Sequence, residues 1–74
     1  MEANKPQRPR LIIREIAEQQ ELNQSQLQIK SGVTPALMNR YWRDKTESVT
    51  LEALGKIARA LGVRSGDLII DDEP

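Results

Sequence analysis

The pentapeptide SGVTP near the middle of the chain constrains the fold more than any other segment. It lies between two short amphipathic stretches of nearly equal length, residues 24–30 and 35–43. Gly32 suits the left-handed backbone of a sharp turn, where a Cβ atom would be strained. Thr34 and Pro35 then supply an N-cap and a first helical position, because proline lacks an amide that would have no partner there. The pattern predicts two helices joined by a tight turn.

Apolar residues at helical spacing predict further helices on both sides of this pair. A first helix of about 11 residues is expected from Arg10. After a charged loop over residues 44–49, Thr50 caps a fourth helix that Gly62 ends, and a last short helix opens at Ser65. The apolar positions that follow the period of the fourth helix are Leu51, Leu54, Ile57, Ala58 and Leu61. The sequence predicts an all-α fold of five helices without strands.

The length and residue types restrict the class of protein. A chain of 74 residues holds one small domain, for which we expect residues 10–70, between a flexible basic arm (1–9) and an acidic tail (71–74). The absence of cysteine and histidine removes thiol catalysis, the usual general base and the commonest metal ligands. No Gly-rich phosphate loop is present. We therefore expect no enzyme, no catalytic residue, no metal and no cofactor.

The start of the chain lacks the apolar run of a signal peptide. No segment approaches the roughly 20 apolar residues that a membrane helix needs. We expect a cytoplasmic protein without a membrane partner.

The formal net charge is zero, but the charges are unevenly distributed. Residues 1–45 carry five acidic side chains and eight basic ones: Lys5, Arg8, Arg10, Arg14, Lys30, Arg40, Arg43 and Lys45. Residues 46–74 carry three basic and six acidic side chains, and they end in Asp71, Asp72 and Glu73 before the last proline. The first half is therefore positive and suited to phosphate, while the tail is negative.

Several short motifs occur together in one order: Leu22-Asn23-Gln24, Leu27, Ser31-Gly32-Val33-Thr34, Arg40, Leu51-Glu52-Ala53-Leu54, Ile57-Ala58, Leu61-Gly62-Val63 and Asp67-Leu68. This order resembles the Xre family, the Cro and phage-repressor type of helix-turn-helix domain, over roughly residues 10–70. The segment Arg40-Tyr41-Trp42-Arg43 with Gly66-Asp67-Leu68 is similar to a short single-domain branch of that family. The resemblance implies a five-helix lambda-repressor-like DNA-binding domain whose second and third helices read DNA.

The same resemblance implies which residues contact DNA. Gln24 matches a position that hydrogen-bonds the phosphate backbone. The positions that match the groove-facing side of the recognition helix (35–43) are Thr34, Pro35, Ala36, Asn39, Arg40 and Arg43, and Lys45 follows them in the expected DNA-binding set. Asparagine can pair with adenine and arginine with guanine, each good bidentate contact contributing about 1–3 kcal/mol of discrimination. Ala36 can contact only a thymine methyl group.

These residues also have plainer interpretations. Arg40 and Arg43 can form an ordinary solvated face or pair with Asp44 and Glu47. Asn39 can be a polar surface residue without a base partner.

Tyr41 and Trp42 are the only aromatic residues, and such a pair can stack on bases. Core packing is favoured, with Tyr41 on the apolar face and Trp42 over the seam between the third and fourth helices. The basic residues of the arm, Lys5, Arg8 and Arg10, either keep the terminus soluble or enter a minor groove.

Two positions depart from the family pattern. Gln28 stands where the family usually has a small residue, so either the two helices are spread slightly or its stem lies along their crossing with the amide in water. Glu21 stands where the family often has glycine, which predicts a tighter or less regular first corner.

The function that we expect is sequence-specific binding of double-stranded DNA by a small transcriptional regulator of the repressor kind. One domain of this size reads about half an operator, which predicts a weak homodimer through the fourth-to-fifth helix surface, completed in solution or only on DNA. The alternative is a protein-interaction module, such as the antitoxin of a toxin-antitoxin pair. In that case the acidic second half and the edge formed by Leu68, Ile69 and Ile70 would bind a basic, toxin-like partner. A third interpretation, a dimerising fragment, is disfavoured by the small apolar surplus outside the core.

Overall fold

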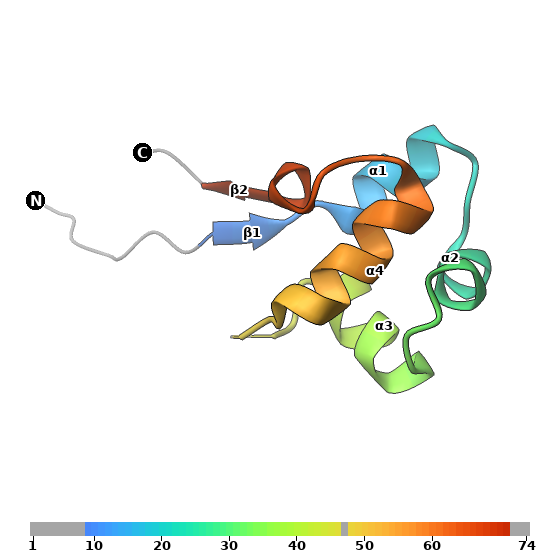
Figure 1. Ribbon diagram of the computed structural model, residues 1–74, viewed down its shortest axis with the longest axis horizontal. Helices are drawn as coiled ribbons and strands as arrows, with labels where there is room; N and C mark the ends of the chain where they lie inside the picture. Colours follow the sequence, from blue (N-terminus) through green and yellow to red (C-terminus); the bar gives the residue numbers. More distant parts are fainter. Residues whose placement is uncertain (1–8, 47, 72–74) are drawn as a thin grey trace, which may run out of the picture.

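The computed structural model describes residues 9–46 and 48–71. Its elements in chain order are β1 (Pro9–Leu11), α1 (Ile13–Gln19), α2 (Gln24–Ser31), α3 (Pro35–Trp42), α4 (Leu51–Leu61), the 3-10 helix η1 (Ser65–Leu68) and β2 (Ile69–Asp71). Figure 1 shows α4 at the centre of the helices, with α1, α2 and α3 around it and the two strands projecting from one end. The helical fold class is confirmed, with four α-helices and a 3-10 turn in place of the fifth helix.

The prediction of a chain without strands is wrong. β1 and β2 pair antiparallel, with Arg10 opposite Ile70 and Leu11 opposite Ile69. The first helix therefore begins at Ile13 and has 7 residues instead of about 11. A short apolar run is compatible with a strand as well as with a helix. Here residues 9–11 form a strand because they pair with residues 69–71, near the other end of the sequence.

The proposed arm and tail lie almost wholly outside the described residues. Pro9, assigned to the arm, is the first residue of β1, and Asp71, assigned to the tail, is the last residue of β2.

The ends of α2, α3 and α4 follow the local signals in the sequence. The side chains of Asn23, Thr34 and Thr50 each accept a hydrogen bond from the backbone N–H three residues later, at 2.7, 3.2 and 3.1 Å. Gly32 and Gly62 end α2 and α4 in the left-handed region, with φ of 79° and 73°. Such caps satisfy backbone groups that have no partner inside the helix, so these boundaries are as predicted.

The first corner is regular, although its left-handed residue is glutamate. Glu21 has φ of 62°. Its N–H donates to the Glu18 carbonyl at 3.0 Å, and the Leu22 N–H donates to the Ala17 carbonyl at 2.9 Å. This is the hydrogen-bond pattern that usually has glycine at the left-handed position.

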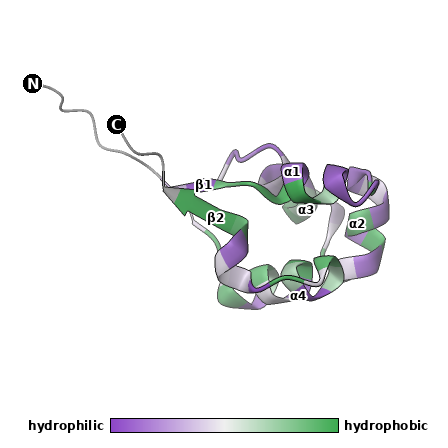
Figure 2. Ribbon diagram, turned by 90° about the horizontal axis from the view of Figure 1, so that it is seen from above, coloured by the Kyte–Doolittle hydropathy of each residue, from purple (hydrophilic) through white to green (hydrophobic). Residues whose placement is uncertain are grey.

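The core is built around α4. Figure 2 shows apolar colour along α4 and β2, with α1 and α3 on the opposite side and α2 across one end. The buried residues are Leu11, Ile13, Ala17, Leu27, Val33, Met38, Tyr41, Ala53, Leu54, Ile57, Ala58, Leu61 and Leu68. Within the described residues, no helix is long and apolar enough to cross a membrane.

Two apolar residues of the helices lie outside this core. Leu51 is 84% exposed, because it is the first residue of α4 and helical side chains lean toward the N-terminus, here beyond the packed region. Leu51 therefore follows the helical period of α4 in the sequence without belonging to its buried side. Ile29 is 74% exposed, since it lies two residues, or about 200° around the helix, from the buried Leu27.

Candidate nucleic-acid interface

The turn between α2 and α3 is closed by Val33 and Gln28. Val33, the apolar residue of the turn, is buried. The side-chain amide of Gln28 donates a hydrogen bond to the Val33 carbonyl. Of the two alternatives for Gln28, the one that leaves its amide in water does not describe this hydrogen bond, because a carbonyl of the turn is within reach of the amide. Gln28 ties α2 to the segment that leads into α3.

The two sides of α3 differ as the sequence predicted. Met38 and Tyr41 are buried, and Leu37 is half-buried. The exposed positions include all the residues assigned to the groove-facing side: Thr34, Pro35, Ala36, Asn39, Arg40 and Arg43. Lys45 is also exposed, three residues after the end of α3. Because Ala36, Asn39, Arg40 and Arg43 are spaced by three, one and three residues, they share one face of the helix.

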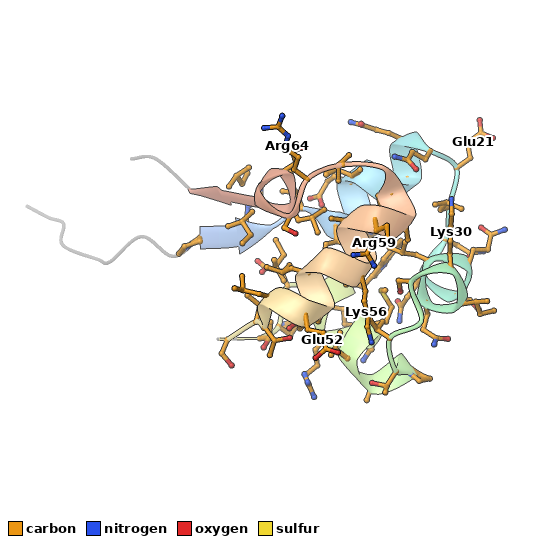
Figure 3. The ribbon with its side chains drawn as sticks, viewed as in Figure 1. Glu21, Lys30, Glu52, Lys56, Arg59 and Arg64 are labelled. Atoms are coloured by element: carbon orange, nitrogen blue, oxygen red, sulfur yellow. The ribbon has the colours of Figure 1, made fainter. Side chains whose placement is uncertain are left out.

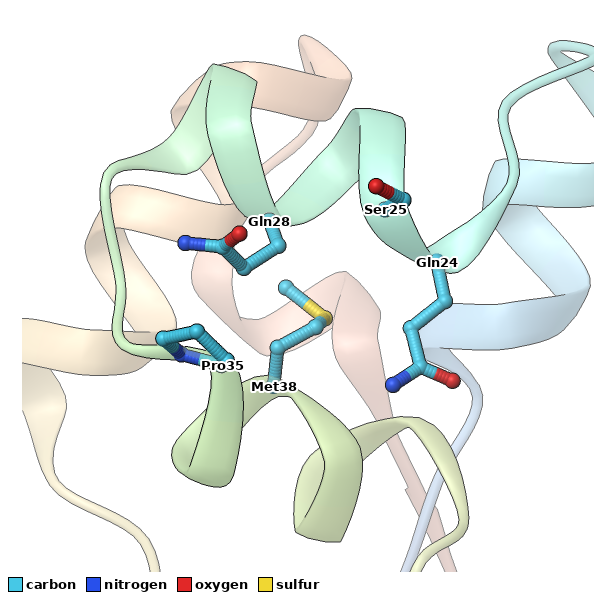
Figure 4. A pocket seen from close by; sticks show the side chains of 5 residues that line it. All are labelled: Gln24, Ser25, Gln28, Pro35 and Met38. Carbon is cyan, nitrogen blue, oxygen red and sulfur yellow. The ribbon is translucent and has the colours of Figure 1, made fainter.

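A shallow hollow of about 280 Å³ lies between α2 and α3. Figure 4 shows Gln24, Ser25 and Gln28 of α2 on one side and Pro35 and Met38 of α3 on the other. The first turn of α2 therefore borders the same surface as the exposed face of α3.

Gln24 and Asn39 are joined directly. The Gln24 amide Nε2 donates to Asn39 Oδ1 at 3.3 Å, between two side chains 15 residues apart. Sequence reasoning treated these residues as separate contacts, one to phosphate and one to a base. Their hydrogen bond fixes how Asn39 presents its amide, since the oxygen is engaged from the side of α2.

The first turn of α3 offers fewer backbone donors than a bare helix N-terminus. Pro35 has no N–H, and the Leu37 N–H donates to Thr34 Oγ1 at 3.2 Å. The Met38 N–H donates to the Thr34 carbonyl at 2.9 Å. Among the described residues of this turn, the Ala36 N–H remains available to donate a hydrogen bond to a group outside the protein.

The C-terminal end of α3 is anchored on two sides. The Thr50 N–H donates to the Tyr41 hydroxyl at 3.2 Å, which joins α3 to the start of α4. Asp44 Oδ1 accepts from the Leu11 N–H of β1 at 3.1 Å. Tyr41 is 2% exposed and Trp42 packs partly buried against the core, so the expectation of core packing for this pair is confirmed.

A second group of charged side chains comes from α2, from α4 and from the segments that follow α1 and α4; two of its members, Glu52 and Lys56, line a hollow with Thr34 and Leu37. Figure 3 labels Glu21, Lys30, Glu52, Lys56, Arg59 and Arg64. Lys56 pairs with Glu52 at 3.7 Å, one turn apart on α4. An exposed pair of this kind contributes little to stability. None of these residues belongs to the set predicted to contact DNA.

The described residues contain no cluster of histidine, cysteine, aspartate or glutamate that could hold a metal ion. The side chains on the exposed face of α3 are amides and guanidinium groups, which donate hydrogen bonds to base edges and phosphates.

The sequence matches the model of the Cro/C1-type helix-turn-helix DNA-binding domain over residues 13–74. The chain belongs to this family. The predicted resemblance is thereby confirmed, and this Cro/C1-type chain carries a DNA-binding domain of the kind used in transcription regulation, which is not an enzyme family. No match is found among curated proteins.

The fold of this Cro/C1-type domain is similar to that of a chain in the solved SinR protein/SinI protein complex. The TM-score is 0.71 and the sequence identity is 21%. The similar region covers 76% of this chain and 54% of that chain, so this chain spans about half the length of its structural neighbour. At this identity the similarity establishes the fold alone.

Proposed function

We propose that this domain binds double-stranded DNA in a sequence-specific manner as a transcriptional repressor, with α3 in the major groove. The observation that carries the proposal is the exposed face of α3, formed by Ala36, Asn39, Arg40 and Arg43, on which Asn39 accepts a hydrogen bond from Gln24 in the first turn of α2. A helix with one buried and one polar, basic face fits the major groove, which is wide enough to admit it. Membership of the Cro/C1-type family supports the same conclusion.

Each side chain has a proposed role. Arg40 donates to the O6 and N7 atoms of a guanine, the commonest specific contact in the major groove. Asn39 reads a neighbouring base in the orientation that Gln24 holds, and Gln24 donates to phosphate from α2. Arg43 and Lys45 contact phosphates beyond the C-terminal end of α3.

The start of α3 has a smaller proposed role. Thr34 and Pro35 approach the backbone of the duplex, where the Ala36 N–H donates to a phosphate oxygen. The Ala36 methyl group packs against a thymine methyl group. Neither contact distinguishes all four base pairs, so most of the specificity comes from Asn39 and Arg40.

The test is selection of bound sequences from a random duplex library. The Arg40→Ala/Arg43→Ala variant is compared with Lys30→Ala/Arg59→Ala, which loses the same number of positive charges from exposed positions away from α3. A motif that is enriched by the wild type, kept by the Lys30/Arg59 variant and lost by the Arg40/Arg43 variant supports the proposal. Equal loss in both variants indicates binding by general charge alone, and no enrichment by the wild type contradicts the proposed function.

We also propose a weak homodimer on DNA, because one domain reads about half an operator and two recognition helices about 34 Å apart fit one face of the duplex. The surface formed by α4 and η1 is the proposed contact. Sedimentation tests the proposal: a two-fold symmetric duplex should bind two copies, and a stable dimer without DNA would contradict the weak form.

A protein partner is the second candidate, favoured by the exposure of Ile70 beside the acidic residues that follow it in the sequence. The structural neighbour was solved in a complex of two different proteins, SinR and SinI, which fits such a role without assigning it. A toxin-like reading frame next to this one, with a product that copurifies with the chain, would support an antitoxin function.

A further inference from the structure

The backbone just after α3 adopts a conformation that few residue types favour. Asp44 has φ of 57°, in the left-handed region. Its N–H donates to the Tyr41 carbonyl at 3.2 Å, and the Lys45 N–H donates to the Arg40 carbonyl at 2.9 Å. These two hydrogen bonds end α3 in a pattern that usually has glycine at the left-handed position. An aspartate tolerates this region better than most residues, but it is still strained relative to glycine.

The side chain of Asp44 explains why an aspartate is useful at this position. Its Oδ1 accepts the Leu11 N–H at 3.1 Å, from a strand 33 residues earlier in the sequence. The Ile12 N–H donates to the Leu68 carbonyl at 2.9 Å, on the β2 side of the chain. Because successive N–H groups of a strand point to opposite edges, the Leu11 N–H points away from β2. Asp44 therefore closes the outer edge of β1 at Leu11.

This hydrogen bond connects two parts of the domain that have different tasks. On one side is the strand pair, and on the other is the junction between α3 and the basic residues that flank Asp44. Arg43 precedes Asp44 and Lys45 follows it, and both are exposed. Tyr41 anchors the same end of α3 to α4 through the Thr50 N–H. The Asp44 bond is thus the second anchor, placed between the two cations.

The negative charge of Asp44 is unfavourable at a surface that binds DNA. A carboxylate between two cations that face phosphates weakens binding to DNA, since phosphate and carboxylate repel each other. An aspartate that weakens DNA binding in this way is useful only if it contributes something else to the domain. The hydrogen bond to Leu11 supplies one, because it satisfies a poorly solvated amide and holds the segment from Arg43 to Lys45 against β1.

We propose that Asp44 is a positioning residue for DNA binding, which acts through Arg43 and Lys45 without touching DNA itself. The proposal rests on the proposed function of α3 as the recognition helix. Without the hydrogen bond, the segment after α3 samples other conformations, and only the fraction in the original arrangement binds at full affinity.

The test compares two neutral variants, which separates position from charge. Asp44→Gly keeps the left-handed backbone without strain and removes the acceptor for the Leu11 N–H. Asp44→Asn keeps an oxygen acceptor and also tolerates the left-handed region. Both variants lose the negative charge, so repulsion from phosphate changes equally in both. The relief of strain in Asp44→Gly opposes the loss of its hydrogen bond, and we expect it to fold.

The expected result is a Kd for the selected duplex that is about two- to tenfold higher for Asp44→Gly than for Asp44→Asn, the range given by the net free energy of one hydrogen bond. In the free protein, amide exchange at Leu11 should be faster in Asp44→Gly than in the wild type and in Asp44→Asn. NMR order parameters at Arg43 and Lys45 should fall in Asp44→Gly only.

Equal affinities of the two variants would overturn the positioning role, even if Asp44→Gly is less stable. Unchanged exchange at Leu11 in Asp44→Gly would overturn the hydrogen bond as the anchor. If the wild type binds no duplex, the proposed function of α3 fails. The exchange and NMR measurements on the free protein then still decide whether Asp44 orders Arg43 and Lys45.

Discussion

Replacing Glu21 by glycine should stabilise the domain. Glu21 closes the corner after α1 at φ of 62°, and its side chain is exposed. The backbone bonds of this corner, from the N–H groups of Glu21 and Leu22, do not involve the side chain. A glycine keeps both bonds and removes the contact between Cβ and the backbone that makes this region unfavourable.

The size of the effect follows from two opposing contributions. The left-handed conformation costs a non-glycine residue about 1–2 kcal/mol. Glycine also gives the unfolded chain more conformational freedom, which lowers the stability of the folded domain by about 0.4–1 kcal/mol. The net gain is about 0–1.6 kcal/mol, and its midpoint of about 0.8 kcal/mol corresponds to a rise in Tm of about 3–6 °C for a domain of this length.

The measurement is thermal and urea denaturation followed by circular dichroism. Glu21→Gln is the matched control, because it removes the carboxylate near the end of α1 but keeps the Cβ atom. We expect Glu21→Gly to exceed Glu21→Gln in stability by this net gain, since Gln keeps the strain and adds no freedom to the unfolded chain. Equal Tm values for the two variants would show that the charge is responsible and would refute the reasoning from backbone strain.

Four further substitutions test the fold and the interface. Leu54→Ala removes a buried side chain of α4 and should cost about 2–5 kcal/mol, enough to unfold much of so small a domain; an unchanged melting curve would contradict the core assignment. Leu51→Lys, three residues earlier, should change the free energy of unfolding by less than about 0.5 kcal/mol because Leu51 is exposed. Arg40→Ala should relax base preference at one position of the selected site, whereas Gln24→Ala should weaken all sequences; identical selection profiles for these two variants would show that the roles are wrongly assigned.

The sequence predicted the ends of α2, α3 and α4 well because the signals for them are local. Thr34 and Thr50 bond backbone groups three residues away, and Gly32 and Gly62 adopt their own left-handed conformation. Nothing distant is needed to recognise such caps. The exposed face of α3 was also predictable, since the burial of Met38 and Tyr41 leaves the intervening positions outside.

The strand pairing and the tertiary hydrogen bonds that were missed depend on residues far apart in the chain. The strand β1 exists because Ile70 and its neighbours lie opposite Arg10 and its neighbours, a pairing that no local period reveals. The bond from Gln24 to Asn39 and that from Leu11 to Asp44 join side chains and backbone of different elements. The left-handed conformation of Asp44 is a feature of the structure and not a signal in the sequence, so nothing local at this position pointed to the contact with Leu11.

The antiparallel pairing of β1 with β2 also has a consequence for the order of folding. Contacts within and between neighbouring helices close short loops, whereas the pairing of Pro9 with Asp71 closes nearly the whole described chain. Non-local contacts of this kind slow folding, and during synthesis β2 leaves the ribosome after all four α-helices. The strand pair is therefore expected to form last. Until it forms, β1 is not held in the place where the Leu11 N–H donates to Asp44, and the hydrogen bond from Thr50 to Tyr41 is left to anchor the end of α3.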